Sequence, residues 1–301
     1  MAIFVVAGLR LIIWAMGTDS VHADVVIGPQ VFEWRVDNPA FGGISALLMD
    51  AGGSVLLAGG DRGTLVQAHV RRDEMGRIAA VEDTRLTPVS LASGLAPTTF
   101  KRDLEALARD SNGVLFMAFE GFVRIERLAW PGARPEPTHP WDHFASLFGN
   151  QAFEALASLP DDRLIAIAET PKASGLADSV IHDGTRWHGG PDIPTGNGFA
   201  ITGADVGPDG CLYLVERRYR LLSGFIFRVR RLSGGPCTRS DTVLYTSAPA
   251  DIGNAEAVAT WHDDQGRIVL DLITDNGFLP FTMTRLIELR AKATERCKLA
   301  F

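Results

Sequence analysis

The sequence predicts an all-β fold, a β-propeller with six blades around a central channel. One pattern recurs five times, with polar or acidic residues 49 to 60 positions apart at Ser45, Glu105, Glu154, Asp205 and Glu256. Each of these residues precedes a turn and an apolar strand that ends in an acid, and long amphipathic helical patterns are absent. A period of about 50 residues with Gly-rich turns indicates repeated units, each a propeller blade of about four strands.

The first element of the chain is a mostly apolar N-terminal segment. Residues 1–17 are apolar except for an interruption at Arg10, and small residues precede a candidate cleavage position after Ala23. We expect residues 1–23 to be a signal peptide and residues 24–301 to be a single propeller domain. A membrane anchor is the alternative, but Arg10 interrupts the roughly 20 apolar residues that an anchor needs. A mis-assigned start codon would also explain the unusual N-terminal residues.

The remaining elements are short strands in a regular order. A strand near Val31 to Val36 is expected to close the ring, and the five recurring strands lie at residues 53–61, 113–120, 162–169, 210–216 and 266–275. Further strand candidates lie at residues 122–130, 179–190, 221–234, 242–247 and 284–291, where apolar and polar residues alternate. A sixth unit would come from residues 62–100 or 171–200.

Two-residue turns would set acidic residues opposite one another in these hairpins. The opposed pairs would be Glu105 with Glu120, Glu154 with Glu169, and Glu256 with Asp275. In the fourth hairpin Asp205 would face Leu214, with Glu216 on the same face two positions later.

Opposed like charges destabilise a sheet unless water or a counter-charge compensates them. Calcium is the simplest counter-charge, because it takes six to eight oxygen ligands from several elements. The alternative is that the acids are solvated in a wide channel mouth or cap neighbouring backbone amides.

The composition narrows the functional class. The chain has 301 residues, 46% of them apolar, and a net charge of −7, which gives no basic footprint for nucleic acid. We expect a monomer with a small-molecule substrate and, after signal cleavage, no membrane association. No G-x-S-x-G motif is present, so a serine hydrolase of the common α/β type is not indicated.

The three cysteines favour one disulfide in an oxidising compartment. Cys237 lies in a Gly-Gly-Pro-Cys loop and is a candidate partner of Cys297. Cys211 lies within a predicted strand and is expected to be a buried apolar residue.

The recurring motifs also resemble those of a known family. They are FGGISAL with GGDRG, DLEALA with FE, NQAFEALASLPDDRLIAIAE, ITGADVGPDGCLYLVERR and NAEAVATWHDDQGRIVLDLITDNGF. In their order and spacing, from about Phe41 to Leu289, they resemble the phytase-like, esterase-like β-propeller family of bacterial exported proteins.

The resemblance implies a calcium-dependent hydrolase of phosphate monoesters or other esters, exported to the periplasm or secreted. The implied metal ligands are Glu105, Glu120, Glu154, Glu169, Asp205, Glu216, Glu256 and Asp275, with Asp61 and Asp103 behind them. Arg62, Arg217 and Arg218 are the implied contacts to the phosphate, although a salt bridge from Arg217 or Arg218 to an acid of a neighbouring blade is an equal alternative.

A second class stays open, because propellers host many unrelated functions. The chain would then be a non-catalytic exported propeller that binds a ligand or partner protein around a structural calcium. An enzyme would keep exposed acids, a cation and arginines around an open space, whereas a binding module would have acids saturated by protein or paired with arginines.

Overall fold

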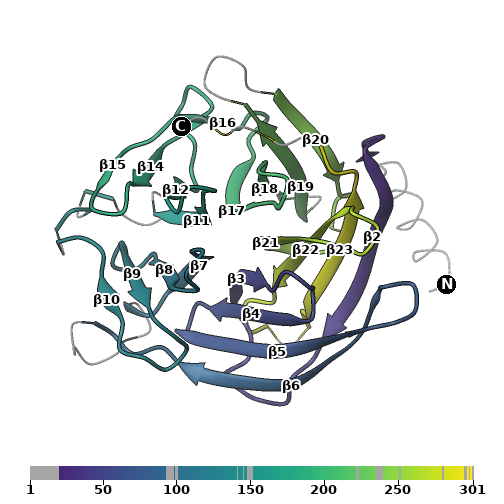
Figure 1. Ribbon diagram of the computed structural model, residues 1–301, viewed down its shortest axis with the longest axis horizontal. Coiled ribbons are helices and arrows are strands. Elements are labelled where there is room, and N and C mark those ends of the chain that lie inside the picture. Colours follow the sequence, from purple (N-terminus) through teal and green to yellow (C-terminus); the bar gives the residue numbers. More distant parts are fainter. Residues whose placement is uncertain are drawn as a thin grey trace, which may run out of the picture.

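Short antiparallel sheets surround a central channel in the computed structural model of the chain (Figure 1). The structure describes residues 20–92, 98, 101–140, 142–144, 146–147, 152–221, 224–234, 240–250, 252–279, 281–294, 297 and 299. We number the sheets as blades 1 to 5 in chain order.

Each blade begins with an inner strand at the channel and ends with an outer strand at the rim. Blade 1 contains β3 (Ile44–Met49), β4 (Val55–Gly60), β5 (Thr64–Arg72) and β6 (Ile78–Pro88). Blade 2 contains β7 (Leu104–Arg109), β8 (Leu115–Phe119), β9 (Arg124–Leu128) and β10 (Glu136–Pro137). Blade 3 contains β11 (Phe153–Ser158), β12 (Leu164–Ala168), β14 (Ser179–His182) and β15 (Trp187–Gly189). Blade 4 contains β17 (Ala200–Val206), β18 (Leu212–Arg220), β19 (Gly224–Ser233), β20 (Ser240–Thr246) and the short β1 (Ser20–Val21). Blade 5 contains β21 (Asn254–His262), β22 (Ile268–Asp275), β23 (Thr284–Ala291) and β2 (Val25–Trp34), and a separate ribbon pairs β13 (Leu176–Ala177) with β16 (Ile193–Pro194).

The propeller class is confirmed, and the expected six blades are corrected to five within the described residues. The two segments considered for a sixth blade have other roles. Residues 62–100 supply the long outer strands β5 and β6 of blade 1, and residues 171–200 supply β14 and β15 of blade 3 together with the β13–β16 ribbon. Long outer strands therefore account for the chain length that suggested another unit.

The N-terminal strand β2 closes the ring, as the sequence predicts. It pairs antiparallel with β23 in blade 5, for example Trp34 with Thr284 and Phe32 with Leu286. The last blade is thus built from both ends of the described chain, and it lies beside blade 1 (Figure 1).

A β-bulge occurs in the inner strand of every blade. The register shifts once along each pairing of the first two strands, so that one residue of the inner strand is left without a direct partner. The bulged residues are Ser45, Glu105, Glu154, Thr202 and Glu256. A bulge bends the strand and re-aims its side chain, so the sequence pattern marks the bulge in four blades, whereas the bulge of blade 4 lies at Thr202, three positions before Asp205.

The hairpin registers predicted from two-residue turns were wrong. The described loop at 110–114, between Arg109 and Leu115, has five residues, and the bulge moves the register further. As a result Leu104 faces Phe119, and Glu105 lies at the bulge instead of opposite Glu120. In blade 4 Asp205 faces Tyr213 rather than Leu214.

Apolar side chains fill the spaces between adjacent blades. One buried cluster joins Leu57, Leu104 and Met117 of blades 1 and 2, and similar clusters lie at the other blade interfaces. The inner strands come so close that a Cβ atom added at Gly203 would lie 2.6 Å from the carbonyl oxygen of Glu256. Small residues at this position are therefore needed to close the ring.

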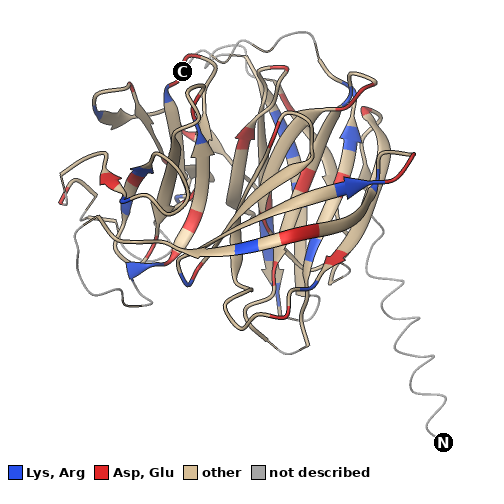
Figure 2. Ribbon diagram, turned by 60° about the horizontal axis from the view of Figure 1, so that its bottom comes forward, with Lys and Arg blue, Asp and Glu red and all other residues tan. Residues whose placement is uncertain are grey.

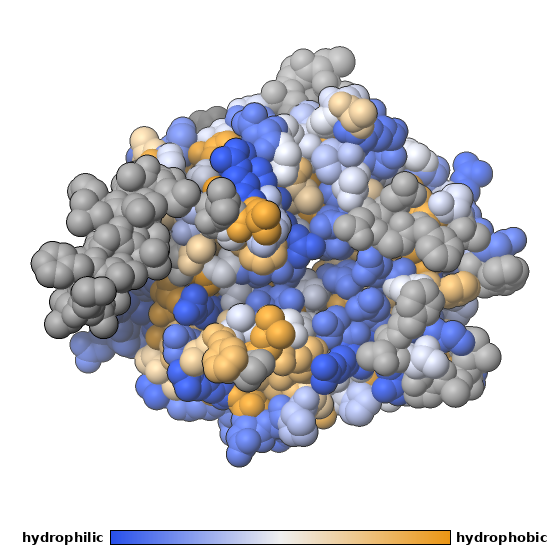
Figure 3. Space-filling model, turned by 180° about the vertical axis from the view of Figure 1, so that it is seen from behind, coloured by the Kyte–Doolittle hydropathy of each residue, from blue (hydrophilic) through white to orange (hydrophobic). Residues whose placement is uncertain are grey.

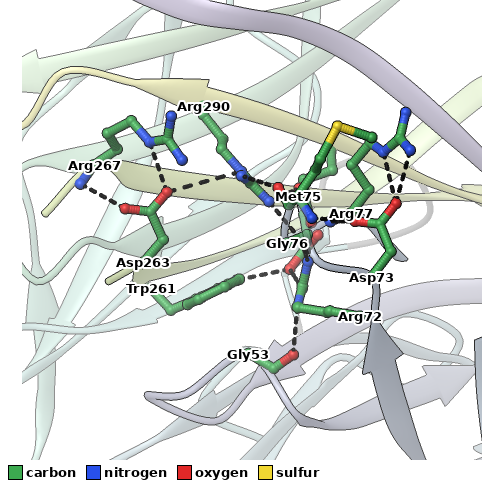
Figure 4. A network of polar contacts seen from close by, with 12 residues as sticks. Gly53, Arg72, Asp73, Met75, Gly76, Arg77, Trp261, Asp263, Arg267 and Arg290 are labelled. Carbon is green, nitrogen blue, oxygen red and sulfur yellow. Dashed lines mark hydrogen bonds and ion pairs between the residues drawn. The ribbon is translucent and has the colours of Figure 1, made fainter. Parts of the chain in front are cut away.

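A network of buried ions joins blade 5 to blade 1 (Figure 4). The guanidinium of Arg72 in β5 donates to the carbonyl oxygen of Gly53 at 2.9 Å and pairs with Asp271 at 3.4 Å and with Glu288. The indole of Trp261 donates to the same Asp271 carboxylate at 2.8 Å. Because Asp271 and Glu288 are 0% and 2% exposed, Arg72 supplies their counter-charge from the neighbouring blade.

A disulfide joins Cys211 to Cys297, with 5.0 Å between their Cα atoms. This corrects the expected pairing of Cys237 with Cys297, and Cys237 itself lies outside the described residues. Cys211 is buried, as expected, but as half of a disulfide. The bond fastens the C-terminal end of the described chain to β18 of blade 4.

Charged residues of both signs occur along the strands as well as in the loops (Figure 2). Viewed from behind, hydrophobic side chains form small groups among hydrophilic ones (Figure 3). Among the described residues no helix is long and apolar enough to cross a membrane. The predicted signal peptide falls almost entirely on residues 1–19, which lie outside the described part.

Candidate functional site

Acidic residues of four blades converge at one mouth of the channel. They occupy the bulge of the inner strand, as Glu105 does, or the end of the second strand or the residue after it, as Glu120 does, except Asp103, which directly precedes the inner strand β7. Both positions lie at the same end of every blade, because equivalent strands run in the same direction around the ring. We define the mouth ring as Asp61, Asp103, Glu105, Glu120, Glu154, Glu169, Arg217, Glu256 and Asp275.

Arg217 is the contribution of blade 4 to the mouth ring. Its Nη2 lies 2.8 Å from Glu169 Oε1 and 3.7 Å from Glu154 Oε2, and its Nη1 pairs with Glu256. Burial lowers the pKa of Arg217, but the carboxylates of Glu256, Glu154 and Glu169 raise it by more, so the guanidinium stays charged. Arg217 thus links blades 3, 4 and 5 through ion pairs. This arrangement matches the alternative, considered from the sequence, of a salt bridge from Arg217 to an acid of a neighbouring blade.

Three acids of blade 2 form the part of the mouth ring that could hold a metal ion. Asp103, Glu105 and Glu120 each bring one carboxylate oxygen to within 4.8 Å of the other two. These acids are half-buried, and no arginine contact to them is among the ion pairs of the described residues. Carboxylate oxygens at this spacing suit a hard cation.

The pKa values of the mouth ring show how crowded its negative charges are. Burial, with the nearby charges of Asp275 and Asp103, raises the pKa of Asp61 to about 7. Burial also raises the pKa of Glu256 to about 8, although Arg217 opposes this shift. For Glu105, burial and the neighbouring carboxylates raise the pKa well above its usual value. The folded chain therefore holds protons here near neutral pH, or needs another positive charge.

Two buried oxygens of the mouth ring have no hydrogen-bond partner among the described residues, Asp61 Oδ1 and Glu169 Oε2. Glu169 is only 5% exposed, and its other oxygen already pairs with Arg217. A buried polar atom without a partner costs free energy. Both oxygens are thus available to a ligand that brings positive charge.

Asp205 does not belong to the mouth ring, which corrects its assignment as a ring ligand. Its Oδ2 accepts hydrogen bonds from the amide and the hydroxyl of Thr260, both at 2.7 Å, and its Oδ1 accepts one from the amide of Val206 at 2.9 Å. It lies at the opposite end of β17, whereas the bulge position of blade 4 is Thr202. Asp205 thus joins blade 4 to blade 5.

Glu216 is also away from the mouth ring and satisfied by protein. It is 0% exposed, and Arg230 donates to its two oxygens at 2.9 and 2.7 Å while Arg228 pairs with it too. The equivalent position at the end of the second strand, where the other blades have acids, is Arg217 in blade 4, because it follows the pairing partner of Ile201 just as Glu169 follows the partner of Phe153. Aligning strands by their bulges, rather than by the nearest acid, would have identified both Thr202 and Arg217 as the equivalent residues.

The other two predicted arginines lie near the mouth but outside the ion pairs of the ring. The guanidinium of exposed Arg62 lies 3.3 Å from the centre of the Phe278 ring, directly after Asp61. Arg218 donates to the carbonyl oxygen of Asn197 at 2.9 Å and lies over the ring of Phe199. Within the described part of the chain, Arg62 is thus the predicted phosphate contact whose guanidinium is in no ion pair or hydrogen bond, although its charge opposes the rise that burial causes in the pKa of the neighbouring Asp61.

The channel is narrow at the level of the inner-strand bulges. A cavity of about 10 Å³, room for no more than one water molecule, is lined there by Glu105 and Glu154 together with apolar side chains such as Leu47. A separate hollow of about 390 Å³, with Asp205 and Thr260 in its wall, lies at the opposite mouth. The mouth ring therefore forms the floor of a cup above this narrow stretch.

Five blades around a cup of carboxylates define a β-propeller with an acidic, metal-type site at one mouth. The chain belongs to the phytase-like family, described as having the esterase-like activity of phytase, whose family model matches residues 39–278. No curated protein matches the chain.

The chain is also similar in fold to solved structures of low sequence identity. A luciferin-regenerating enzyme matches with a TM-score of 0.50 and 11% identity, over 91% of this chain and 100% of the other. A protein described as a putative gluconolactonase has a TM-score of 0.48 and 13% identity, over 90% and 96%. The aldose sugar dehydrogenase of Streptomyces coelicolor has a TM-score of 0.48 and 13% identity, over 89% and 100%. At such identity the luciferin-regenerating enzyme indicates the propeller fold alone.

Proposed function

We propose that the chain is a calcium-dependent hydrolase of phosphate monoesters or other esters, with its active site at the mouth ring. The observation that carries this proposal is the gathering of eight carboxylates from four blades at one mouth, three of them paired with Arg217. Membership of the phytase-like family supports an ester as the substrate. The substrate would be a small molecule.

Calcium fits the donor set of the mouth ring. The ring offers carboxylate oxygens and neither thiolate nor imidazole, and calcium prefers six to eight oxygen ligands whereas zinc and copper favour nitrogen or sulfur. The Asp103, Glu105 and Glu120 oxygens and the unpartnered Oδ1 of Asp61 are the ligands we propose. Bound calcium would polarise the ester and lower the pKa of an attacking water.

The arginines would contact the anionic part of the substrate. Arg62 is exposed at the rim, and its contact with Phe278 would hold the guanidinium in place beside the cup. Arg217 would partly neutralise the negative charge of the cup floor through its ion pairs with three glutamates. Arg218 is a weaker candidate for contact with the substrate, because its guanidinium already donates a hydrogen bond to the carbonyl oxygen of Asn197.

An activity assay with a matched pair of variants tests this proposal. Release of the alcohol from an aryl phosphate and from a carboxylic ester is measured with calcium and with a chelator. Glu105→Gln should lower the calcium-dependent rate at least about tenfold. The control is Glu136→Gln in the same blade, whose side chain is 62% exposed and pairs with Arg127 at the rim. Equal rates for the two variants would refute a role of the ring in hydrolysis.

The second candidate is a non-catalytic exported propeller that binds a ligand or partner protein around a structural calcium. The pairing of Arg217 with three carboxylates favours it, because a saturated ring is what a purely structural site requires. Calcium would then raise the melting temperature while neither ester is hydrolysed at any calcium concentration.

We also propose that residues 1–23 direct export to the periplasm or outside, and that residues 24–301 act as a single monomeric domain. The Cys211–Cys297 disulfide supports an oxidising compartment. Cleavage after Ala23 would remove β1 and leave β2 intact. Mass spectrometry of the mature protein identifies the first residue, and a product that still begins at Met1 would contradict this proposal.

A further inference from the structure

A second cavity lies beside the mouth ring, at the same end of blade 2. It has a volume of about 580 Å³, within the usual range for small-molecule sites of about 300 to 1,000 Å³. Its walls are mostly apolar and include Leu91, Phe122, Ile125, Pro137 and Pro140. The cavity thus offers a surface that suits a hydrophobic ligand.

The polar residues of this cavity are largely occupied by protein. Arg124 donates to Glu126 at 2.8 Å and to the carbonyl oxygens of Phe122 at 3.1 Å and Lys101 at 2.7 Å. His139 accepts from the amide of Ile125 at 3.0 Å through Nε2, and its Nδ1 contacts the carbonyl oxygen of the next residue at 2.7 Å. Arg124 and His139 therefore have little hydrogen-bonding capacity left for a highly polar ligand.

The charges around the cavity also fix how an amphiphilic anion would lie in it. Glu126 is 3% exposed, and its Oε2 has no hydrogen-bond partner among the described residues, so its charge would repel an anionic group placed deep in the cavity. Lys101 lines the cavity and precedes the ring residue Asp103 by two positions. An anionic group would therefore lie toward Lys101 and the mouth ring.

We propose that this cavity binds the apolar alcohol portion of the ester, so that the substrates are amphiphilic esters with an aryl or alkyl group rather than compact polyols carrying many phosphates. This inference rests on the proposed function. Phe122 connects the two sites, because it lines the cavity two positions after Glu120 of the mouth ring.

Exposed apolar side chains at the same mouth support an amphiphilic substrate. They lie near the end of the second strands of blades 2, 4 and 5 or in the residues that follow, where the mouth ring also lies. They are Phe122, Tyr219, Leu221, Leu279 and Phe281, which are 42%, 59%, 85%, 60% and 96% exposed. A compact polyanion would gain nothing from this rim, whereas an aryl or alkyl group would bury apolar surface on it.

Binding of a neutral fluorescent probe, phenylnaphthylamine, to the full chain tests the cavity without reference to catalysis. Ala92→Trp places an indole where Ala92 lines the cavity, and Phe122→Ser removes an apolar wall at a partly exposed position that folding tolerates. Each should weaken probe binding about tenfold. The control is Val243→Trp, a 40% exposed residue on outer strand β20 of blade 4, which should leave binding unchanged. Equal binding by all three variants and the wild type would overturn the proposal.

Hydrolysis of two phosphate esters tests the link to the substrate. The ratio of kcat/KM for naphthyl phosphate to kcat/KM for glycerol phosphate should fall about tenfold in Ala92→Trp and stay constant in Val243→Trp. A constant ratio in Ala92→Trp, together with loss of probe binding, would refute the substrate role while leaving the proposed function intact. Failure of the wild type to hydrolyse either ester would instead overturn the proposed function and the substrate role with it, and the probe titration would still decide whether the cavity binds an apolar ligand.

Discussion

Replacing Arg217 with Met should destabilise the chain in a way that depends on both pH and calcium. The substitution keeps the apolar stem of the side chain and removes the positive charge that faces Glu154, Glu169 and Glu256. Those carboxylates belong to blades 3 and 5, which flank blade 4 on its two sides. The variant therefore leaves both of these blades with negative charge that Arg217 no longer compensates.

The magnitude follows from the burial of these groups. Glu154, Glu169 and Glu256 are 5% to 8% exposed, and the Arg217 side chain is 23% exposed. Removing one partner of a buried ion pair costs about 3 to 5 kcal/mol. Since Arg217 is partly solvated, we expect the lower end, about 3 kcal/mol. At roughly 2 °C per kcal/mol, the melting temperature should fall by roughly 6 °C.

The pH dependence has a definite sign. The folded-state pKa of Glu256 is about 8, above its ordinary value of 4.5, so the folded chain binds more protons than the unfolded chain between these two pH values. Stability therefore falls as pH rises through this window, and the cost of ionising Glu256 in the fold is fully present above about pH 8. Without Arg217 this cost grows, so the variant should lose most stability at alkaline pH and little near pH 4.5.

Thermal unfolding followed by circular dichroism measures this effect at acidic and alkaline pH, with calcium and with chelator. Calcium should recover more of the melting temperature in Arg217→Met than in the wild type, because a cation that binds the folded state replaces the lost charge. The matched control is Arg127→Met, whose side chain is 57% exposed in its pair with Glu136. A loss for Arg217→Met that equals the control, or that is the same at both pH values, would refute this account of the ring.

Three further predictions concern the ring, the blade joint and the disulfide. Calcium should bind more weakly at pH 6 than at pH 8 in a calorimetric titration, because protons compete for the proposed ligands Asp61, whose pKa is about 7, and Glu105, whose pKa burial raises well above its usual value; equal affinity would exclude these acids as ligands. Arg72→Leu should lower the free energy of unfolding in urea by about 3 to 5 kcal/mol with or without calcium, because it leaves the buried Asp271 without an ion-pair partner among the described residues and leaves Glu288 with Arg290 alone. Reducing the Cys211–Cys297 bond, which closes a loop of 86 residues, should cost about 2 to 4 kcal/mol in a thermal melt; an unchanged melt would mean that the C-terminal tether adds nothing to stability.

The last two of these measurements have internal controls. Arg71→Leu changes the arginine that precedes Arg72 in the sequence. Arg71 forms an exposed ion pair with Glu82, and this pair should contribute little to the free energy of unfolding. If Arg71→Leu and Arg72→Leu lower stability equally, the buried joint between blades 1 and 5 does not have the role we give it. For the disulfide, the melt of Cys211→Ser should match that of the reduced wild type, and a clearly higher melt of the variant would contradict the cross-link effect.

The sequence predicts the fold class because the turn-and-strand pattern survives in every blade. It does not predict the blade number, because strands such as β5 and β6 are long and take up the residues that a sixth blade would need. The register is also hidden from sequence. A loop of five residues and a bulge at Glu105 each shift the pairing, and only the path of the backbone distinguishes them from a two-residue turn.

The candidate site is predictable where a blade keeps the pattern and fails where one departs from it. Glu154 and Glu169 lie in the ring as expected, from the bulge and from the end of the next strand. Blade 4 breaks the rule, because Thr202 occupies its bulge and an arginine its second ring position. Asp205 and Glu216 look equivalent along the chain, but Asp205 lies three positions after the bulge residue Thr202, at the opposite end of its strand. Glu216 lies one position before Arg217, where the alternation of side chains along a strand points it away from the ring.

The pairing of β2 with β23 ties the first strand of the ring to the last one. During synthesis β2 cannot make this pairing until β23, residues 284–291, is available, so a chain truncated before β23 cannot close the ring in this way. A circular permutant that joins the termini and opens a loop elsewhere would place all four strands of blade 5 in one stretch of sequence. The difference between its folding rate and that of the natural chain would measure how much the late pairing of β2 with β23 slows folding.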